Sequence, residues 1–383
     1  MTDGAKVFKK SSPNGKITAY LTRRDFVDDL TRTWPVEGVV VVDHEYLRGR
    51  KVFVRVSISY RYGREEDEVM GLNFSKEFVL TKCEVMLKRV EERKAGGTVA
   101  RLLEKLGAEA CPFAILLPEN APPSVTLEPG AEGTKKKLGV IYELMLYVAE
   151  NVDEEPHKRN SVSFAVRKIQ LAPKKSSGRH PQILVSRGFT LNPGKLHLEV
   201  CLDRDLYFYG ESLEPQVNIS NFSKKTVKYI VAQVVQHVEV TVTNTHFSRI
   251  VASIESREGC PIIPDSSFSR TIGLTPLAFR AFGVALDGQL QDKDAGLAAS
   301  TVVSARMSAS DALGIVVSYS LRVKLNCGSL SGELMAEVPF KLMHPDPIDS
   351  GDFTDISRSV DSLEFEDFSV LRRGKSVSDE IEC

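Results

Sequence analysis

The chain has 383 residues, 42% of them hydrophobic and 26% charged, which is enough for two globular domains. No apolar run approaches the roughly 18 residues that a membrane-spanning helix needs, and the N-terminal MTDGAKVFKK lacks the apolar segment of a secretory signal. The six cysteines are scattered singly without a CxxC pair. We therefore expect a cytoplasmic protein with reduced thiols, without a zinc site or a disulfide framework.

The net charge of −1 conceals two regions of opposite charge. Residues 346–383 carry eleven acidic and four basic side chains, a net of −7, whereas residues 1–345 carry a net of +6. One interpretation is a solvated tail that keeps the protein soluble. The other is a tail that folds back onto a basic site meant for another anion.

Strand patterns follow one another along most of the chain, separated by turn residues. Val-rich or alternating runs predict strands at 36–43, 51–61, 138–148, 161–171, 196–203, 226–243, 313–325 and 333–343. One segment differs, because TVARLLEKLG at 98–107 places Val99, Leu102, Leu103 and Leu106 on one helical face. We predict an all-β protein with one short amphipathic helix, which Thr98 and Gly107 cap.

Pro, Lys, Ser and Gly concentrate near PKKSSGRHPQILVSR at 173–187, which predicts a domain boundary there. The expected organisation is two antiparallel β-sandwich domains, a hinge and an acidic regulatory tail: 1–175, 176–187, 188–345 and 346–383. The Ser-rich tail has little aliphatic content. We expect it to be mostly disordered or docked as a strand.

No motif of an enzyme or metal site occurs, since GxGxxG, P-loop, GxSxG and HExxH patterns are all absent. The seven histidines show no metal-ligand spacing. His157 follows three acidic residues, which we interpret as a solvated loop. We predict a non-catalytic protein with no metal, no cofactor and no nucleic-acid partner.

Six segments, in family order from about residue 6 to 373, resemble arrestins. They are VFKKSSPNGKITAYLTRRDFVDD (7–29), YRYGREEDEVMGLNFSKE (60–77), HKRNSVSFAVRKIQ (157–170), ALDGQLQDKDAGLAASTVV (285–303), GIVVSYSLRVKLN (314–326) and EFEDFSVLRR (364–373). RYGREEDEVMG is similar to invertebrate visual arrestins in particular. The resemblance implies the arrestin fold, with a helix on the back of the first sandwich and a tail that returns to it.

The resemblance also implies a function. Arrestins bind activated, phosphorylated G protein-coupled receptors such as rhodopsin, block the G protein and, in many members, recruit the endocytic coat. The expected location is the cytoplasm, with recruitment to the plasma or photoreceptor membrane. Two alternatives stay open: a general receptor arrestin acting mainly in endocytosis, and an arrestin-like trafficking scaffold without a phosphate sensor.

The resemblance assigns four basic residues to receptor phosphates: Lys9, Lys10, Arg24 and Lys105. Each phosphate carries about −1.5 to −2 charges, so a multiply phosphorylated receptor segment outcompetes a carboxylate tail. Lys9 and Lys10 are adjacent on the expected first strand and point to opposite faces. Both reach one anion only near a sheet edge or through their long side chains. The alternative for each residue is an ordinary surface cation.

Arg167 lies within the strand-like run SVSFAVRKIQL, where a charge is costly unless it is paired. The resemblance supplies Asp25, Asp287 and Asp294 as partners in a polar core buried between the domains. Phosphate that competes for Arg167 would free the aspartates and let the domains rotate. The alternative is an ion-pair network with no switching role.

The tail departs from the family at Val370, where many arrestins carry a second arginine of the polar core; Arg372 and Arg373 lie further on. Gln289 and Gln291 also stand where some relatives have lysines. We therefore expect a looser or less phosphate-dependent latch than in family members that carry both arginines.

A loop that resembles the receptor-probing finger loop follows the strand at 51–61. Gly63 and Gly71 bracket it and permit a change of shape. From composition alone it is an acidic hairpin loop. Its expected receptor-contacting residues are Tyr62, Gly63, Arg64, Glu65, Glu66, Asp67, Glu68, Val69, Met70, Gly71 and Leu72.

The tail residues Phe365, Phe368 and Arg372 resemble the motif that binds the β-appendage of the clathrin adaptor complex. Their spacing puts them on one helical face, whereas the same phenylalanines in a strand would hold the tail on the first domain. Ser376 and Ser378 are candidate phosphorylation sites. Four further cations are candidate ligands of inositol polyphosphates or phosphoinositides, or plain surface residues: Lys158, Arg159, Arg322 and Lys324.

Overall fold

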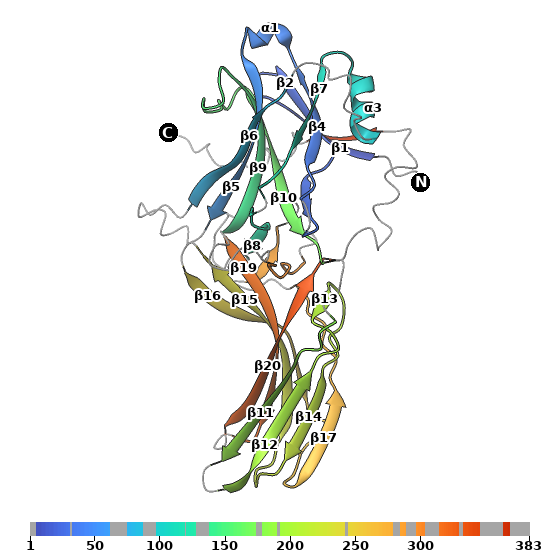
Figure 1. Cartoon of the computed structure of the whole chain (residues 1–383), viewed down its shortest axis with the longest axis vertical. Coiled ribbons are helices and arrows are strands. Elements are labelled where there is room, and N and C mark those ends of the chain that lie inside the picture. Colours follow the sequence, from blue (N-terminus) through green and yellow to red (C-terminus); the bar gives the residue numbers. More distant parts are fainter. Residues whose placement is uncertain are drawn as a thin grey trace, which may run out of the picture.

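Two β-sandwiches lie end to end along the long axis of the molecule (Figure 1). The computed structural model describes residues 5–30, 33–61, 75–86, 97–118, 120–127, 138–173, 178–189, 192–241, 244–278, 284–288, 296–302, 314–328, 332–344 and 363–367. The arrangement confirms the predicted all-β fold with two largely antiparallel sandwiches. None of the described helices combines the length and apolar content that crossing a membrane requires.

One sheet of the first sandwich has the strand order β21-β1-β2-β4-β7. Its strands are β1 (Ala5–Ser11), β2 (Ile17–Leu21), β4 (Val36–Val42), β7 (Ala110–Ile115) and β21 (Leu363–Asp367). The facing sheet follows the path β18-β8-β9-β10-β3, with β5 paired to β9 and β6. Its strands are β3 (Asp25–Asp28), β5 (Lys51–Arg61), β6 (Ser75–Glu84), β8 (Val125–Leu127), β9 (Leu138–Ala149), β10 (Ser161–Gln170) and β18 (Ala285–Asp287). Inward-facing Val, Leu and Phe side chains fill the space between the two sheets.

The second sandwich packs the sheet β11-β12-β14-β17 against the sheet β13-β20-β19-β15-β16. Its strands are β11 (Gln182–Phe189), β12 (Asn192–Cys201), β13 (Leu206–Phe208), β14 (Gln216–Asn221), β15 (Tyr229–Val240), β16 (Thr245–Ser256), β17 (Ser266–Thr271), β19 (Ile315–Asn326) and β20 (Glu333–Met343). Strand β11 lies partly within the segment 176–187 that the sequence predicts as a hinge. It is an edge strand with half-exposed side chains, so its strand pattern is weak.

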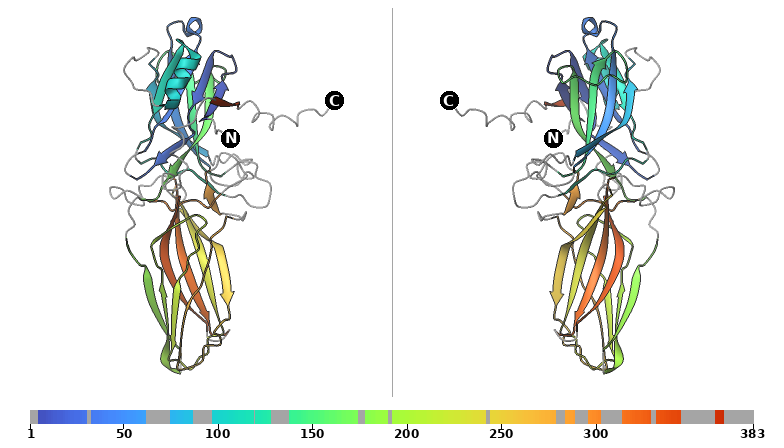
Figure 2. Two further views of the ribbon diagram at one scale, coloured as in Figure 1. Left: turned by 90° about the vertical axis from the view of Figure 1, so that its right-hand side faces the viewer. Right: turned by 90° about the vertical axis from the view of Figure 1, so that its left-hand side faces the viewer.

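The predicted amphipathic helix is present as α3 (Gly97–Leu106), and Gly107 ends it with a φ of +80°. Its buried residues Val99 and Leu102 belong to a cluster with Val7, Tyr20 and Val39, which fixes the helix on the outer face of the β1 sheet. Figure 2 shows the helix against this face of the first sandwich. A second helix, α1 (His44–Leu47), is a single turn that is too short to leave a periodic pattern in the sequence.

Besides the pairing of β21 with β1, two features tie the second half of the chain to the first sandwich near β8 and β10. Strand β18 pairs antiparallel with β8, with Asp287 opposite Val125. The side-chain amide of Gln170, at the end of β10, donates to the Val302 carbonyl at 2.9 Å and accepts from the Val302 N–H at 3.0 Å. The domains therefore meet through strand pairing as well as through side chains.

Candidate functional site

An ion-pair network centred on Arg167 lies where the two domains meet. Strand β10 pairs in parallel with β3, which sets Arg167 opposite Asp25. The guanidinium forms a bidentate ion pair with this carboxylate, with Nε donating to Oδ1 at 2.6 Å and Nη2 donating to Oδ2 at 3.2 Å. The remaining Nη1 donates to Oδ2 of Asp287 at 3.1 Å.

Asp287 lies at the end of β18, and the pairing of β18 with β8 places it beside Arg167. Its N–H donates to the Gly296 carbonyl at 2.9 Å, and the neighbouring Gly288 N–H donates to the Ser124 carbonyl at 3.2 Å. The Asp287 side chain is 9% exposed, against 33% for Asp25. Asp287 therefore depends more on protein partners for its charge.

The electrostatics favour a charged Arg167. Burial by itself would lower its pKa, but the hydrogen bond and charge of Asp25, with a further contribution from Asp287, outweigh burial and raise the pKa. One guanidinium thus holds two carboxylates, one from β3 and one from β18. Among the described residues, an anion that draws Arg167 away would remove the only Lys or Arg with which either carboxylate forms an ion pair.

Arg24 connects this network to the basic strand β1. Its carbonyl accepts the N–H of Arg167 at 3.0 Å, and its Nε donates to the Ala165 carbonyl at 2.9 Å. The guanidinium carbon lies 5.3 Å from the centre of the Phe8 ring on β1. Arg24 is only 7% exposed, so it lies behind the surface instead of on it.

Lys9 and Lys10 occupy opposite faces of β1, as expected from strand geometry. The Lys9 amine lies 6.0 Å above the Tyr20 ring, within the cluster that α3 covers. The Lys10 amine reaches the other way and donates to the Ser163 carbonyl on β10 at 2.5 Å. Lys105 is exposed in the last turn of α3. These residues therefore lie on both sides of β1.

Strand β21 of the acidic tail pairs in parallel with this basic strand. Leu363 lies opposite Ala5, and Asp367 lies opposite Lys9. The sequence of β21 is LEFED, with three acidic residues in five. Since β21 is the outermost strand of the sheet, β1 becomes the edge wherever β21 is absent.

Several predicted site residues are not placed. The loop residues 62–72, Asp294, Phe368 and Arg372 lie outside the described part of the chain. Phe365 is placed by its backbone alone, opposite Val7.

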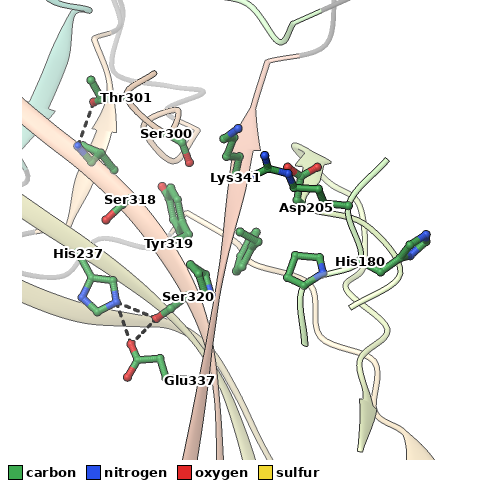
Figure 3. Close-up of a pocket in the computed structure, with 15 residues that line it drawn as sticks. His180, Asp205, His237, Ser300, Thr301, Ser318, Tyr319, Ser320, Glu337 and Lys341 are labelled. Carbon is green, nitrogen blue, oxygen red and sulfur yellow. Dashed lines mark hydrogen bonds and ion pairs between the residues drawn. The ribbon is translucent and has the colours of Figure 1, made fainter. Parts of the chain in front are cut away.

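The four candidate inositol phosphate residues do not form one site. Lys158 and Arg159 are exposed between β9 and β10 of the first sandwich, whereas Arg322 and Lys324 lie on β19 of the second. Arg322 pairs with Glu337 at 3.2 Å, and Lys324 approaches Glu333 at 3.8 Å. Glu337 also accepts from Ser320 beside a cavity of about 870 Å³, shown with His237 in Figure 3.

Lys168 is a buried cation beside the network that was not predicted from the sequence. Its amine donates to the Ala121 carbonyl at 2.6 Å and pairs with Asp28 at 2.8 Å, and its side chain is 3% exposed. Burial along β10 alternates, so Val166 and Lys168 face the core while Arg167 faces the domain junction. The alternation of inward and outward side chains along this strand is the sequence signal that could have identified Lys168 as a buried cation.

Two sandwiches joined at an ion-pair network, with a tail strand on the first, define the class of this protein, and comparison with known families agrees. The chain matches the family "Arrestin (or S-antigen), N-terminal domain" over residues 17–172 and "Arrestin (or S-antigen), C-terminal domain" over residues 192–347. The chain belongs to the arrestin family.

Individual relatives are invertebrate proteins of similar length. The chain is 52% identical to an "Arrestin homolog" of Locusta migratoria over 345 residues, covering 89% of this chain and 85% of the relative. It is 53% identical over 346 residues to "Arrestin, lateral eye" of Limulus polyphemus, with 90% and 85% coverage. It is 47% identical over 350 residues to "Phosrestin-1" of Drosophila melanogaster, with 91% and 87% coverage.

Proposed function

We propose that this protein is a visual-type receptor arrestin. It binds an activated, phosphorylated rhodopsin-like receptor, blocks access of the G protein and so terminates signalling, without catalysis. Family membership and the lateral-eye relative support this function. The observation that carries it is the acidic strand β21 lying on the basic strand β1. Arg24 connects β1 to the Arg167 network, because its guanidinium lies over the Phe8 ring and its carbonyl accepts the N–H of Arg167.

Displacement of the tail is the first step of the proposed mechanism. A receptor phosphate carries about −1.5 to −2 charges and three acceptor oxygens, whereas each carboxylate of LEFED carries one charge. A phosphorylated segment that takes the place of β21 meets Lys9 on one face of the strand and Lys10 on the other. Lys105 on α3 adds a third cation on the helix side.

Opening of the interdomain latch is the second step. Arg24 contacts β1 through Phe8 and contacts Arg167 through its own carbonyl, so both arginines lie along one path from the strand edge to the network. Phosphate near Arg24 competes with Asp25 and Asp287 for positive charge. Asp287, the more buried carboxylate, then loses its partner, which disfavours the closed domain arrangement.

Receptor engagement and domain rotation complete the proposal. The loop at 62–72 enters the receptor cavity, and Asp294 joins the latch together with Asp287. The domains move about the linker near 176–187, of which residues 182–187 are part of β11 in the second sandwich. The units 1–175 and 188–345 are the moving bodies, except that β18 stays in the sheet of the first sandwich. Val370 in place of a tail arginine leaves the latch with less positive charge, so binding of unphosphorylated activated receptor is measurable.

Tail release also supports a proposed endocytic role. In this proposal Phe365, Phe368 and Arg372 bind the β-appendage of the clathrin adaptor complex only after β21 leaves β1, because Phe365 is part of the docked strand. Calorimetric titration of the β-appendage with the full chain tests this. Adding a multiply phosphorylated receptor peptide should increase the affinity, and Phe368→Ala should abolish binding. Unchanged affinity with the peptide would contradict coupling to tail release.

Contact with phosphoinositides involves two separate patches in this proposal. Lys158 and Arg159 on the first domain and Arg322 and Lys324 on the second act independently, because they lie on different sandwiches. The ion pairs of Arg322 and Lys324 with Glu337 and Glu333 reduce the second patch's attraction for anions. These contacts support recruitment from the cytoplasm to the receptor-bearing membrane.

The function is tested by co-sedimentation with membranes containing light-activated rhodopsin, phosphorylated or not. Wild type should bind the phosphorylated form more tightly, and Arg167→Glu should bind both forms similarly. Arg257→Glu is the matched control, because Arg257 is 76% exposed and, among the described residues, contacts only the nearby Glu255 as an ion pair and the Tyr229 ring at 5.7 Å. Equal binding of both forms by wild type would contradict phosphate gating, and no binding at all would favour the scaffold alternative.

A further inference from the structure

His344 lies where the second domain returns to the first. It follows β20 directly, and its carbonyl accepts the N–H of Ala172 at 3.1 Å. It also forms an isolated bridge with Leu171, just beyond β10. The acidic tail begins two residues later in the sequence, at residue 346. The His344 backbone is therefore fixed at the junction of both domains and the tail.

The imidazole of His344 faces the Arg167 network. Its Nε2 lies 3.6 Å from Oδ2 of Asp287, the same oxygen that accepts from Arg167. Within the described part of the chain, this buried nitrogen has no hydrogen-bond partner. The ring packs edge-on against Tyr209, with centroids 4.6 Å apart. Burial raises the Tyr209 pKa well above its ordinary value, so this neighbour stays neutral.

The ion-pair network around Asp287 has more negative than positive charge, so a second cation would be attracted to it. Among the described residues, Arg167 from β10 faces two carboxylates, and two of its three donated bonds go to Asp25. At 3.6 Å a neutral imidazole makes no hydrogen bond to Asp287, whereas a protonated one is attracted to it by charge. Histidine is the side chain that ordinarily changes charge between about pH 5 and 8.

We propose that His344 is a further positioning residue of the interdomain latch and makes that latch sensitive to pH. This inference rests on the proposed role of the Arg167 network. Protonated His344 gives Asp287 a second positive partner. Val370 of the tail is uncharged and cannot provide one. The closed state is favoured as the pH falls, so discrimination against unphosphorylated receptor increases.

The test uses the full chain with light-activated rhodopsin in disc membranes, phosphorylated or unphosphorylated, at about pH 6 and about pH 8. The measured quantity at each pH is the Kd for unphosphorylated receptor divided by the Kd for phosphorylated receptor. Because the receptor phosphates themselves titrate near pH 6, each variant is compared with His344→Gln at the same pH. Relative to His344→Gln, the wild-type ratio should be about fivefold larger at the lower pH and similar at the higher pH, the effect of one partly exposed ion pair. His344→Lys should give a larger ratio than His344→Gln at both pH values.

Three further variants serve as controls. They distinguish the charge of His344 from its packing, and failure of this inference from failure of the proposed function. His180→Gln changes an exposed histidine and should follow wild type. Asp287→Asn removes the partner carboxylate and should show only the pH dependence of the receptor phosphates, even if His344→Gln fails to fold. If the ratio changes with pH in Asp287→Asn or His344→Gln as much as it does in wild type, the inference is overturned. If Arg167→Glu leaves selectivity intact, the latch itself is refuted instead.

Discussion

Replacing Arg167 with Gln tests how strongly the network stabilises the closed structure. The substitution removes a forked ion pair to Asp25 and a charged hydrogen bond to Asp287. Breaking a fully buried pair costs about 3–5 kcal/mol, because the partner charge is left without compensation. Asp25 is 33% exposed and is partly rehydrated, while Asp287 at 9% is not. We expect the free energy of unfolding to fall by about 2–3 kcal/mol.

Urea unfolding followed by tryptophan fluorescence measures this loss, because the single tryptophan, Trp34, lies in the first sandwich with Arg167. A double-mutant cycle with Asp287→Asn isolates the pair. The double variant Arg167→Gln/Asp287→Asn should lose about 1–2 kcal/mol less free energy of unfolding than the sum of the losses of the two single variants. The reason is that the double variant no longer carries the Asp287 carboxylate that Arg167→Gln leaves uncompensated. Additivity within about 0.3 kcal/mol would refute the assignment of Arg167 as the partner that Asp287 requires.

Three further substitutions test other parts of the structure. Lys168→Met leaves Asp28 buried without its cation and should cost about 3 kcal/mol in urea unfolding, with partial recovery on adding Asp28→Asn; a loss below about 1 kcal/mol would contradict the buried pair. Gly38→Ala places a Cβ 2.3 Å from the Tyr20 carbonyl oxygen and should lower stability by about 1–3 kcal/mol, whereas Gly188→Ala, which meets no atom within 4 Å, should have little effect. Although burial opposes it, hydrogen bonds from Ser320 and Arg322 lower the Glu337 pKa. Its stabilisation is therefore present above the unfolded-state pKa of about 4.3 and lost as pH falls through the folded value. Glu337→Gln should reduce stability by about 1 kcal/mol at neutral pH, and calorimetry should show this deficit shrinking between about pH 5 and 3; a constant deficit would contradict the reasoning.

The local parts of the fold were predictable from the sequence because alternation and helical periodicity are local signals. The strands at 36–43, 51–61 and 333–343 agree with β4, β5 and β20 to within a residue, and the helix at 98–107 agrees with α3. The docked-strand interpretation of the tail agrees with β21. Such elements follow from the side chains of each segment alone.

The remaining features depend on contacts between distant segments. The pairing of β18 with β8 joins residues near 286 to residues near 126, and no local pattern reports such a register. Asp25 became a candidate partner of Arg167 through the family resemblance, since the parallel pairing of β3 with β10 is equally nonlocal. His344 carried no signal, because its position beside Asp287 arises only when both domains are assembled.

The most direct measurement is hydrogen exchange of the β1 and β21 amides in the full chain, with and without a multiply phosphorylated receptor peptide. In the proposed mechanism, receptor phosphates take the place that β21 holds on β1. The phosphopeptide should therefore remove protection from amides in 363–367, while β1 keeps its protection through β2 and the bound peptide. The unphosphorylated peptide should change the protection of neither strand. Protection of 363–367 that persists at saturating phosphopeptide would refute this displacement, because binding and tail docking would then occupy different sites.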